Sequence, residues 1–418
     1  MDWENLAEND VQRDEGGKIV SLSLLSKRLD ELPPQIGQLT SLTELNVRCN
    51  LFRTLPSSIG QLTGLTLLDA RGNSLRTLPS EIGRLTALTE LRIDDNQFQT
   101  LSPSIGQLTS LTQLDIYNNQ LRTLPAEIGQ LGALTALSVI KNRELTTFPP
   151  EIGQLTSLRT LMAGSTRIET LPSEMSQLTS LTQLCINCNK LETLPAWIGQ
   201  LTNLTTLYVS QNRLQTLPAE IGQLTALTKL FAWHNQLETL PAEIGQLTNL
   251  TILYLQNNRL QTLPPEIGQL GALSTLYVSN NLLQFLPPEI GQLSALTDLD
   301  IQDNPLQTLP PEMRQLTALA RLDADRIRMT MLSTLDITPD TQLHSLPPIN
   351  PRCRIYGFDS NAVKLSHYLW REWWNNRAQI GRAYAVCWNR TRKWKERRGL
   401  TRVPRHPTME ILSLLFEE

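Results

Sequence analysis

Residues 108–130 read LTSLTQLDIYNNQLRTLPAEIGQ, and this 23-residue stretch recurs with few changes from residue 19 to residue 311. Thirteen copies follow one another, with leucines at fixed positions, an asparagine near the middle of most copies and the phrase Leu-Pro-x-Glu-Ile-Gly-Gln or a close variant of it. A unit of this kind cannot bury its own leucines, so it has to stack against its neighbours. The sequence therefore predicts a solenoid of stacked coils, which offers an extended surface and no single deep pocket.

The asparagine marks the period of the repeat. It occurs every 23 residues, except between Asn142 and Asn189, where the step is 47 and Thr166 takes the slot between them. An additional residue near Glu144 accounts for the longer step, and Lys27 fills the slot one period before the first asparagine. The short amide can satisfy backbone groups of adjacent coils, so the stack is expected to contain a ladder of buried amides. Its members are Asn50, Asn73, Asn96, Asn119, Asn142, Asn189, Asn212, Asn235, Asn258, Asn281 and Asn304.

Each repeat is expected to form one short strand and one short helical segment. Leu114, Asp115 and Ile116 are typical of the strand, with apolar residues two apart that point inward. Pro125 suits a first helical turn, and Gly129 stands where the chain must approach its neighbour or leave the helical conformation. With strands roughly 4.8 Å apart, about fourteen coils trace an arc on the order of 60 Å. The expected fold is an α/β solenoid, a horseshoe with a parallel concave sheet and short helical or 3-10 segments on its convex side.

The repeat resembles the 23-residue leucine-rich repeats of the Scribble and Ras-suppressor type, and similar tandem arrays in bacterial proteins. The resemblance rests on the spaced leucines, the asparagine and the Leu-Pro-x-Glu-Ile-Gly-Gln phrase, and it covers most of the chain. It implies recognition of a protein partner on the concave side of the horseshoe. Because such arrays carry out many unrelated tasks, the partner has to be sought in the residues that vary.

The chain divides into an N-terminal cap at 1–18, a solenoid of about fourteen repeats at 19–348 and a C-terminal module at 349–418. Of the 37 basic and 40 acidic residues, 14 and 6 lie at 350–418, a net charge of +8, which leaves 23 and 34 for the rest, a net charge of −11. We find no secretory signal and no run of roughly 18 apolar residues. Five cysteines, an odd number, do not suggest a disulfide framework. A cytoplasmic location is expected, or delivery into a host cell if the chain is a bacterial effector.

The register of the repeats breaks after residue 311, and two continuations are open. One places the next coil at 319–324. The other, which we favour, places a fourteenth repeat at 332–348, preceded by a longer helix over 312–328. Residues 353–356 are expected to add a capping strand, because something must cover the exposed end of the core.

The residue four positions before each asparagine is expected to point outward from the concave sheet. Four successive members of that column are aromatic, and a tryptophan two positions along one strand widens the patch. Aromatic residues in a concave patch are typical of binding hot spots, although they also favour strands for packing reasons alone. We favour binding, because these positions vary while the surrounding phrase is copied. The predicted binding residues are the aromatic stripe, Tyr208, Phe231, Trp233, Tyr254 and Tyr277, and an acidic flank, Asp298 and Asp300, which suits a basic rim on the partner.

The N-terminal half of the same face carries charges of both signs in place of aromatic residues. The acidic residues there are Glu44, Asp69, Glu90, Asp94, Asp95 and Asp115, and the basic ones are Arg48, Arg71 and Arg92.

The C-terminal module shows apolar residues at three- to four-residue steps from residue 361 onward, which predicts helices. Its tryptophans lie among basic residues, and three interpretations are open. It caps the last coil, which we favour, or it binds an anionic membrane or a calmodulin-like groove, or it binds nucleic acid. An outward basic surface is compatible with all three. The basic residues are Arg371, Arg377, Arg382, Arg390, Arg392, Lys393, Lys395, Arg397 and Arg398.

The sequence contains no phosphate-binding, zinc-protease or serine-hydrolase motif. Cys185 and Cys188 form a C-x-x-C pair without a second pair of ligands, so no metal site is expected. Bacterial ubiquitin ligases with similar repeats use a Cys-x-Asp motif, and Cys353 and Cys387 both lack its aspartate. We predict a non-catalytic protein-recognition scaffold without cofactor, metal or small-molecule substrate. The alternative is an effector or signalling adaptor whose basic module binds an anionic membrane or nucleic acid.

Overall fold

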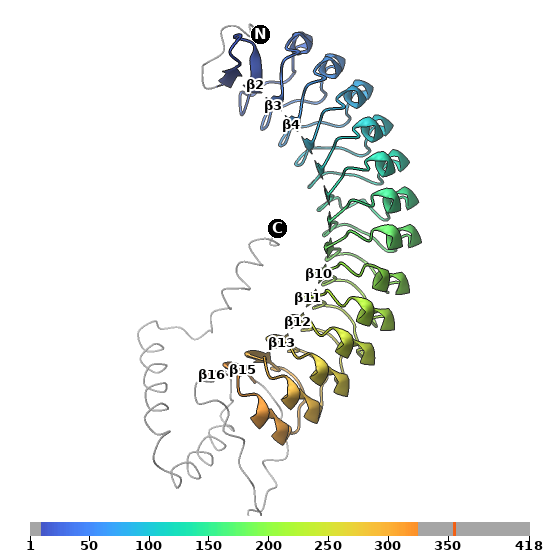
Figure 1. Ribbon diagram of the computed structural model, residues 1–418, viewed down its shortest axis with the longest axis vertical. Helices are drawn as coiled ribbons and strands as arrows, with labels where there is room; N and C mark the ends of the chain where they lie inside the picture. The colour runs from blue at the N-terminus through green and yellow to red at the C-terminus, as the bar shows by residue number, and fades with distance from the viewer. Residues whose placement is uncertain (1–9, 325–353, 357–418) are drawn as a thin grey trace, which may run out of the picture.

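The computed structural model describes residues 10–324 and 354–356. Short strands line the inner edge of a curved solenoid, and single 3-10 turns line its outer edge (Figure 1). The strands form one 16-stranded sheet in chain order. Strand β1 (Val11–Arg13) runs antiparallel to β2 (Ile19–Ser23) and covers the first coil, whereas each later strand is parallel to its neighbours. The predicted horseshoe with a parallel concave sheet is confirmed.

From η3 to β15, five-residue turns alternate with three-residue strands. The strands are β3 (Glu44–Asn46), β4 (Leu67–Asp69), β5 (Glu90–Arg92), β6 (Gln113–Asp115), β7 (Ala136–Ser138), β8 (Thr160–Met162), β9 (Gln183–Cys185), β10 (Thr206–Tyr208), β11 (Lys229–Phe231), β12 (Ile252–Tyr254), β13 (Thr275–Tyr277), β14 (Asp298–Asp300), β15 (Arg321–Asp323) and, last, β16 (Arg354–Tyr356). The turns are η3 (Pro34–Gln38), η4 (Ser57–Gln61), η5 (Ser80–Arg84), η6 (Pro103–Gln107), η7 (Ala126–Gln130), η8 (Pro150–Gln154), η9 (Ser173–Gln177), η10 (Ala196–Gln200), η11 (Ala219–Gln223), η12 (Ala242–Gln246), η13 (Pro265–Gln269), η14 (Pro288–Gln292) and η15 (Pro311–Gln315).

The Leu-Pro-x-Glu-Ile-Gly-Gln phrase produces the outer turn. Pro125 has φ −69° and ψ 152°, so it stands in extended backbone just before η7. The expectation that it forms part of the first helical turn is therefore wrong. The backbone N–H of Ile128 bonds to the carbonyl of Pro125 at 3.0 Å, which is the three-residue step of a 3-10 helix. A Cβ added to Gly129 would lie 2.6 Å from the carbonyl oxygen of Glu151 in the next coil. The glycine therefore permits the close approach of successive turns.

Leucines and isoleucines from every coil form one continuous core, which runs from Ile19 to Ala324. In each strand from β3 to β15 the middle residue is buried, as Leu114 is, while its two neighbours face the concave side. The large apolar residues that recur along the chain therefore stabilise the stack, and the residues between them are free to vary.

The asparagine ladder is present as predicted. Asn119 donates from Nδ2 to the carbonyl of Ile116 at 3.2 Å and to that of Ile93, in the preceding coil, at 3.1 Å. Its Oδ1 accepts the backbone N–H of Phe98 at 3.0 Å. The residue before it, Asn118, has φ 49°, a left-handed conformation that aspartate and asparagine tolerate better than most residues. Each asparagine thus joins two coils at a tight turn.

Thr166 interrupts this ladder locally. Its hydroxyl donates to the carbonyl of Ala163 at 3.2 Å, within its own coil, and also bonds to Oδ1 of Asn189. The backbone N–H of Leu145, which an asparagine would accept, bonds to the carbonyl of Asn142 at 3.0 Å instead. The sheet continues through this point, because β8 pairs in register with β7 and β9.

The structure corrects our preferred account of the C-terminal end of the array. The long helix expected over 312–328 is wrong, since η15 ends at Gln315 and β15 begins at Arg321. The coil at 319–324, the continuation that we did not favour, extends the sheet, and the capping strand expected at 353–356 is present as β16. The proposed repeat at 332–348 and the helical module from residue 361 onward lie outside the described residues. Within the described ranges, no helix is long and apolar enough to cross a membrane.

Candidate functional site on the concave face

Parallel pairing places equivalent residues of successive coils side by side on the concave face. Tyr208 pairs with Phe231, Phe231 with Tyr254, and Tyr254 with Tyr277. The structure therefore brings these four members of the aromatic stripe together in one row across β10–β13.

The rings of this row are packed against one another. Tyr208 and Phe231 stack with centroids 4.6 Å apart, and so do Tyr254 and Tyr277, while Phe231 meets Tyr254 edge to face at 5.1 Å. Phe231 is only 8 % exposed, whereas the three tyrosines are half-buried. Burial raises the pKa of each tyrosine, so their hydroxyls remain protonated at neutral pH. The row combines a rigid apolar surface with hydroxyl groups that can donate hydrogen bonds.

Trp233 lies at the edge of the row. It is half-buried, and its ring packs against His234 at 5.1 Å. In the same column, one coil to either side, Ser210 is 2 % exposed and Gln256 is 8 % exposed. Ser210 Oγ and Gln256 Oε1 are buried and have no hydrogen-bond partner among the described residues. A buried polar atom without a partner is uncommon and calls for an explanation.

The acidic flank has partners that the sequence analysis missed. Asp298 forms an ion pair with Arg321 at 2.7 Å. The guanidinium of Arg321 also lies 5.7 Å from the ring centroid of Tyr277, and it donates a hydrogen bond to the tyrosine hydroxyl. Arg321 follows Asp298 by one 23-residue period, which could have predicted that the two side chains lie side by side. The expected helix over 312–328 excluded Arg321 from the sheet, so this pairing was not predicted.

Asp300, the other residue of the acidic flank, is mostly buried. It accepts hydrogen bonds from the backbone N–H and from Nε2 of Gln302, at 3.2 and 3.3 Å. Burial raises the pKa of its carboxyl to about 6. The acidic flank is therefore largely compensated within the protein, and offers less negative charge to a partner than the sequence suggests.

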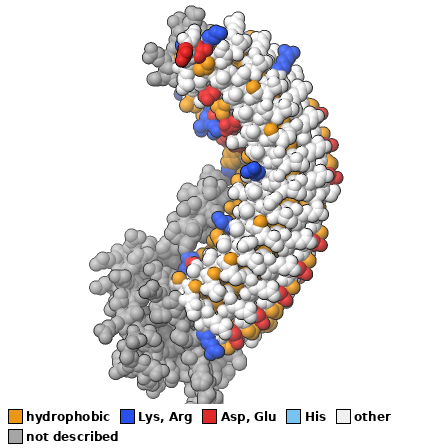
Figure 2. All heavy atoms as spheres, viewed as in Figure 1, with side chains coloured by type: hydrophobic (Ala, Val, Ile, Leu, Met, Phe, Trp, Pro, Cys, Tyr) orange, Lys and Arg blue, Asp and Glu red, His pale blue; other side chains and the backbone are white. Residues whose placement is uncertain are grey.

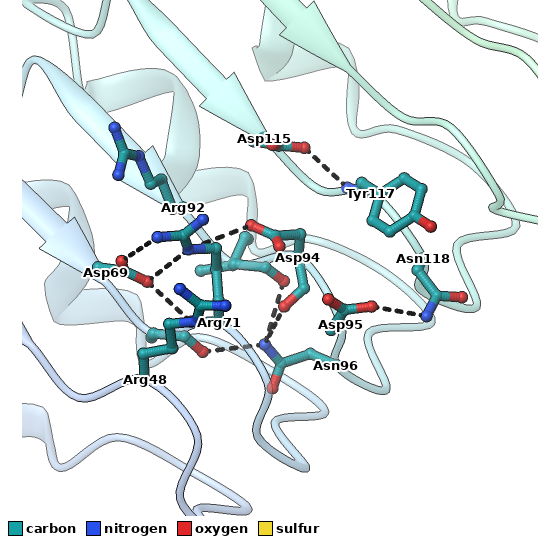
Figure 3. A network of polar contacts seen from close by, with 12 residues as sticks. Arg48, Asp69, Arg71, Arg92, Asp94, Asp95, Asn96, Asp115, Tyr117 and Asn118 are labelled. Atoms are coloured by element: carbon teal, nitrogen blue, oxygen red, sulfur yellow. Dashed lines mark hydrogen bonds and ion pairs between the residues drawn. The ribbon is translucent and has the colours of Figure 1, made fainter. Parts of the chain in front are cut away.

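Charged residues gather on the concave edge near the N-terminal coils (Figure 2) and form the network drawn in Figure 3. Arg71 binds Asp69 with two hydrogen bonds, Nε to Oδ1 at 2.9 Å and Nη2 to Oδ2 at 2.6 Å. Its Nε also lies 3.8 Å from Oδ1 of Asp94. One coil further on, Arg92 pairs with Glu90. Arg71 and Arg92 thus have acidic partners on their own or an adjacent coil.

Asp94 is the least satisfied member of this charged network. It is buried, and its Oδ1 has no hydrogen-bond donor among the described residues. Desolvation, followed by repulsion from Asp115, raises the pKa of its carboxyl to about 6, although Arg71 acts in the opposite direction. At the far side of the network, Lys141 lies 5.4 Å from the ring centroid of Tyr117.

The two cysteines of the C-x-x-C pair are free thiols beside the aromatic row. Cys185 pairs in register with Tyr208 and donates to Oδ1 of Asn187 at 2.8 Å, and Cys188 donates to Oε1 of Gln211 at 2.6 Å. Burial raises the pKa of the Cys185 thiol to about 11 and that of Cys188 in the same direction. Both are therefore weak nucleophiles. In the part of the chain that the structure describes, no group of three or more histidine, cysteine and acidic side chains is placed to hold a metal ion.

The basic residues of the C-terminal module, from Arg371 to Arg398, lie outside the part of the chain that the structure describes.

Family models match most of the solenoid. The model of the leucine-rich repeat region matches residues 18–97, 91–189 and 150–239, and two further leucine-rich repeat models match 248–306 and 225–267. No match was found among curated proteins.

Solved structures with similar folds come from bacteria and plants. A leucine-rich-repeat protein of Leptospira interrogans is 38 % identical, with a TM-score of 0.69 over 79 % of this chain and 81 % of that one. A plant peptide hormone receptor, solved in complex with its peptide, is 29 % identical with a TM-score of 0.65, over 77 % of this chain and 54 % of the receptor. An internalin of Listeria monocytogenes is 21 % identical with a TM-score of 0.63, over 78 % and 89 %, and shows the fold alone. The repeat, the asparagine ladder and these matches together show that the chain belongs to the leucine-rich repeat proteins.

Proposed function

We propose that this protein is a non-catalytic scaffold that recognises a protein partner through the aromatic stripe on its concave face. The observation that carries the proposal is the row of stacked rings across β10–β13, with Trp233 at its edge. Leucine-rich repeat structures such as the plant hormone receptor are solved with a peptide bound, which supports a protein or peptide ligand here. We also propose that the repeats are of the Scribble and Ras-suppressor type, and that the protein acts in the cytoplasm or in a host cell into which it is delivered.

Packing alone accounts for part of the stripe. Phe231 is almost fully covered by Tyr208 and Tyr254, so its role is chiefly to support the other rings. Trp233 is different, because it stays half-buried next to two polar atoms that lack partners. Rings held in place by stacking lose little conformational freedom when a ligand binds, which favours affinity. These features suit a binding surface better than a packing motif.

The test compares variants that change the exposed part of the stripe with a variant that changes an exposed aromatic residue elsewhere. Trp233→Ala and Tyr208→Ala remove half-buried rings, whereas Phe285→Ala removes a ring that is 54 % exposed and lies outside the stripe. Phe231→Ala is unsuitable, because it would create a cavity among the other rings.

Affinity purification from a cell lysate with mass spectrometry identifies a partner, and titration calorimetry then measures its affinity for each variant. We expect Trp233→Ala to weaken binding by roughly 30-fold, the effect of a hot-spot residue, with Phe285→Ala unchanged. Circular dichroism checks that all variants are folded. Equal affinity of the unmodified protein and both stripe variants for every captured partner would remove the stripe as the binding surface.

A second candidate function rests on the charge of the C-terminal module. Residues 350–418 carry a net charge of +8 against −11 for the rest of the chain, which favours contact with an anionic membrane or nucleic acid. Binding to vesicles that contain phosphatidylserine, or to a DNA duplex, should then weaken steeply with added salt and disappear when residues 361–418 are deleted. Salt-independent binding, or binding that survives the deletion, contradicts this function.

A further inference from the structure

We propose that β11 provides an acidic-peptide site, in which a carboxylate of the partner pairs with Lys229 while an apolar side chain of the same segment packs on Trp233. The proposal rests on the proposed function, since it names the chemistry that the aromatic stripe recognises. It reverses the charge that the sequence suggests, because the acidic flank predicted a basic partner.

Lys229 is an exposed cation beside the stripe. Its neighbours in the sheet are Thr206 and Ile252, which are uncharged, and no ion pair to Lys229 is found within the described ranges. Three other cations of the concave face differ in this respect, because each forms an ion pair: Arg71 with Asp69, Arg92 with Glu90 and Arg321 with Asp298. The charge of Lys229 is therefore available to a ligand.

The acidic flank beside the stripe is poorly placed to bind a basic ligand. Asp298 already has Arg321 at 2.7 Å, and Asp300 is buried with Gln302 as its hydrogen-bond donor. A basic side chain would have to displace these internal partners, whereas a carboxylate meets Lys229 without any displacement. The available charge thus favours an acidic group.

The other end of the site is polar as well as apolar. Ser210 and Gln256, the neighbours of Trp233 in adjacent coils, are both more than nine-tenths buried, and each carries an oxygen without a hydrogen-bond partner in the described structure. A peptide backbone can supply N–H donors to these oxygens after small side-chain rotations, and a lipid chain cannot. The pair of oxygens therefore points to a polypeptide beside the indole.

The spacing along β11 and the two residues that follow it defines the ligand further. Lys229, Phe231 and Trp233 are alternate residues of one extended segment, so the lysine and tryptophan Cα atoms are about 13 Å apart. An extended peptide that lies along β11 spans this distance in about four residues. The site accordingly takes a segment with aspartate or glutamate about four residues from a large apolar residue, and Phe231 forms its floor.

A random peptide library displayed on phage tests this inference with the full chain as bait. Baits are the unmodified protein, Lys229→Glu, Trp233→Ala and Arg259→Glu, the last a matched reversal of an exposed cation on the next coil. We expect the unmodified protein and Arg259→Glu to select acidic residues near a large apolar residue, and Lys229→Glu to select basic residues at the same place. Selected peptides made synthetically, in Glu and Lys versions, should each prefer the bait of opposite charge by about five-fold.

Three results overturn the inference: no charge preference, a preference that Lys229→Glu leaves unchanged, or no enrichment over Trp233→Ala. The proposed function fails separately from the inference. If Trp233→Ala loses the captured partner while Lys229→Glu neither changes the selected charge nor weakens that partner, the stripe remains a binding surface and the acidic site is excluded. If Trp233→Ala, Tyr208→Ala and Lys229→Glu all leave the affinity for the partner unchanged, the proposed function itself is excluded.

Discussion

Two regions of the concave face share a scaffold and differ in surface chemistry. Around β4–β6 the outward positions carry a charged network, and around β10–β13 they carry stacked aromatic rings. The inward leucines of both regions are fully buried, and both stand on the same asparagine ladder. The fold therefore depends on the inward and turn positions, so the outward positions are free to specialise.

The outward side chains of the two regions also find their partners in different ways. Arg71 and Arg92 have acidic partners in the charged network, while the rings of the stripe stack on one another. A buried carboxyl with its pKa raised to about 6 nevertheless occurs in both places: Asp94 in the charged network, and Asp300 in the strand next to the stripe.

The largest expected effect comes from the ladder beneath the two regions. Asn96→Ala and Asn235→Ala each remove Nδ2 donors to two coils and leave a backbone N–H, that of Leu75 or Leu214, without its acceptor. Because an unsatisfied buried group costs about 1–3 kcal/mol, we expect each substitution to lower the free energy of unfolding by roughly 2–4 kcal/mol. Urea denaturation followed by circular dichroism measures both. The two losses should agree, since a large difference between them would show that the outward residues also stabilise the fold.

The sequence was sufficient to predict the solenoid, because its period, leucine positions and asparagines are repeated many times. It also placed Tyr208, Phe231, Tyr254 and Tyr277 in one row, since a parallel sheet aligns residues one period apart. The prediction of the register failed at 312–324, because Ile327 stands where most earlier coils have the asparagine. Strand pairing and burial of Leu319 and Leu322 continue the stack there without that signal.

What the sequence could not provide is how outward side chains pair. Whether Asp298 faces solvent or an arginine depends on the coil that follows, and Arg321 was not assigned to that coil. The near-parallel stacking of the rings and the burial of Phe231 depend on rotamers, which the repeat pattern does not specify. The sequence therefore placed the acidic flank next to the stripe, but it did not predict that internal partners compensate the charge of this flank.

The second prediction concerns the buried carboxyl beside the stripe. Asp300 has an ordinary pKa of 3.8, raised by burial to about 6, so the folded state binds more protons than the unfolded state between pH 4 and pH 6. The free energy of unfolding should therefore fall as the pH rises through this window and stay lower above it. Asp300→Asn removes this penalty and should raise stability at pH 7 by on the order of 2 kcal/mol. Denaturation at pH 4 and pH 7 measures the change, and an equal effect of the substitution at both values contradicts it.

The smallest expected effect separates two ion pairs of the charged network. Arg92 and Glu90 are partly exposed, with 37 % and 21 % of their side-chain surfaces accessible, whereas Asp69 beside Arg71 is 6 % accessible. Solvent screening weakens an exposed pair, so a double-mutant cycle with Arg92→Ala and Glu90→Ala should give a coupling of about 0.5 kcal/mol. The two-bond Arg71–Asp69 pair should couple more strongly and respond less to added salt. Equal couplings would mean that burial does not distinguish the pairs, and that the charged network acts as a solvated surface throughout, unlike the packed stripe.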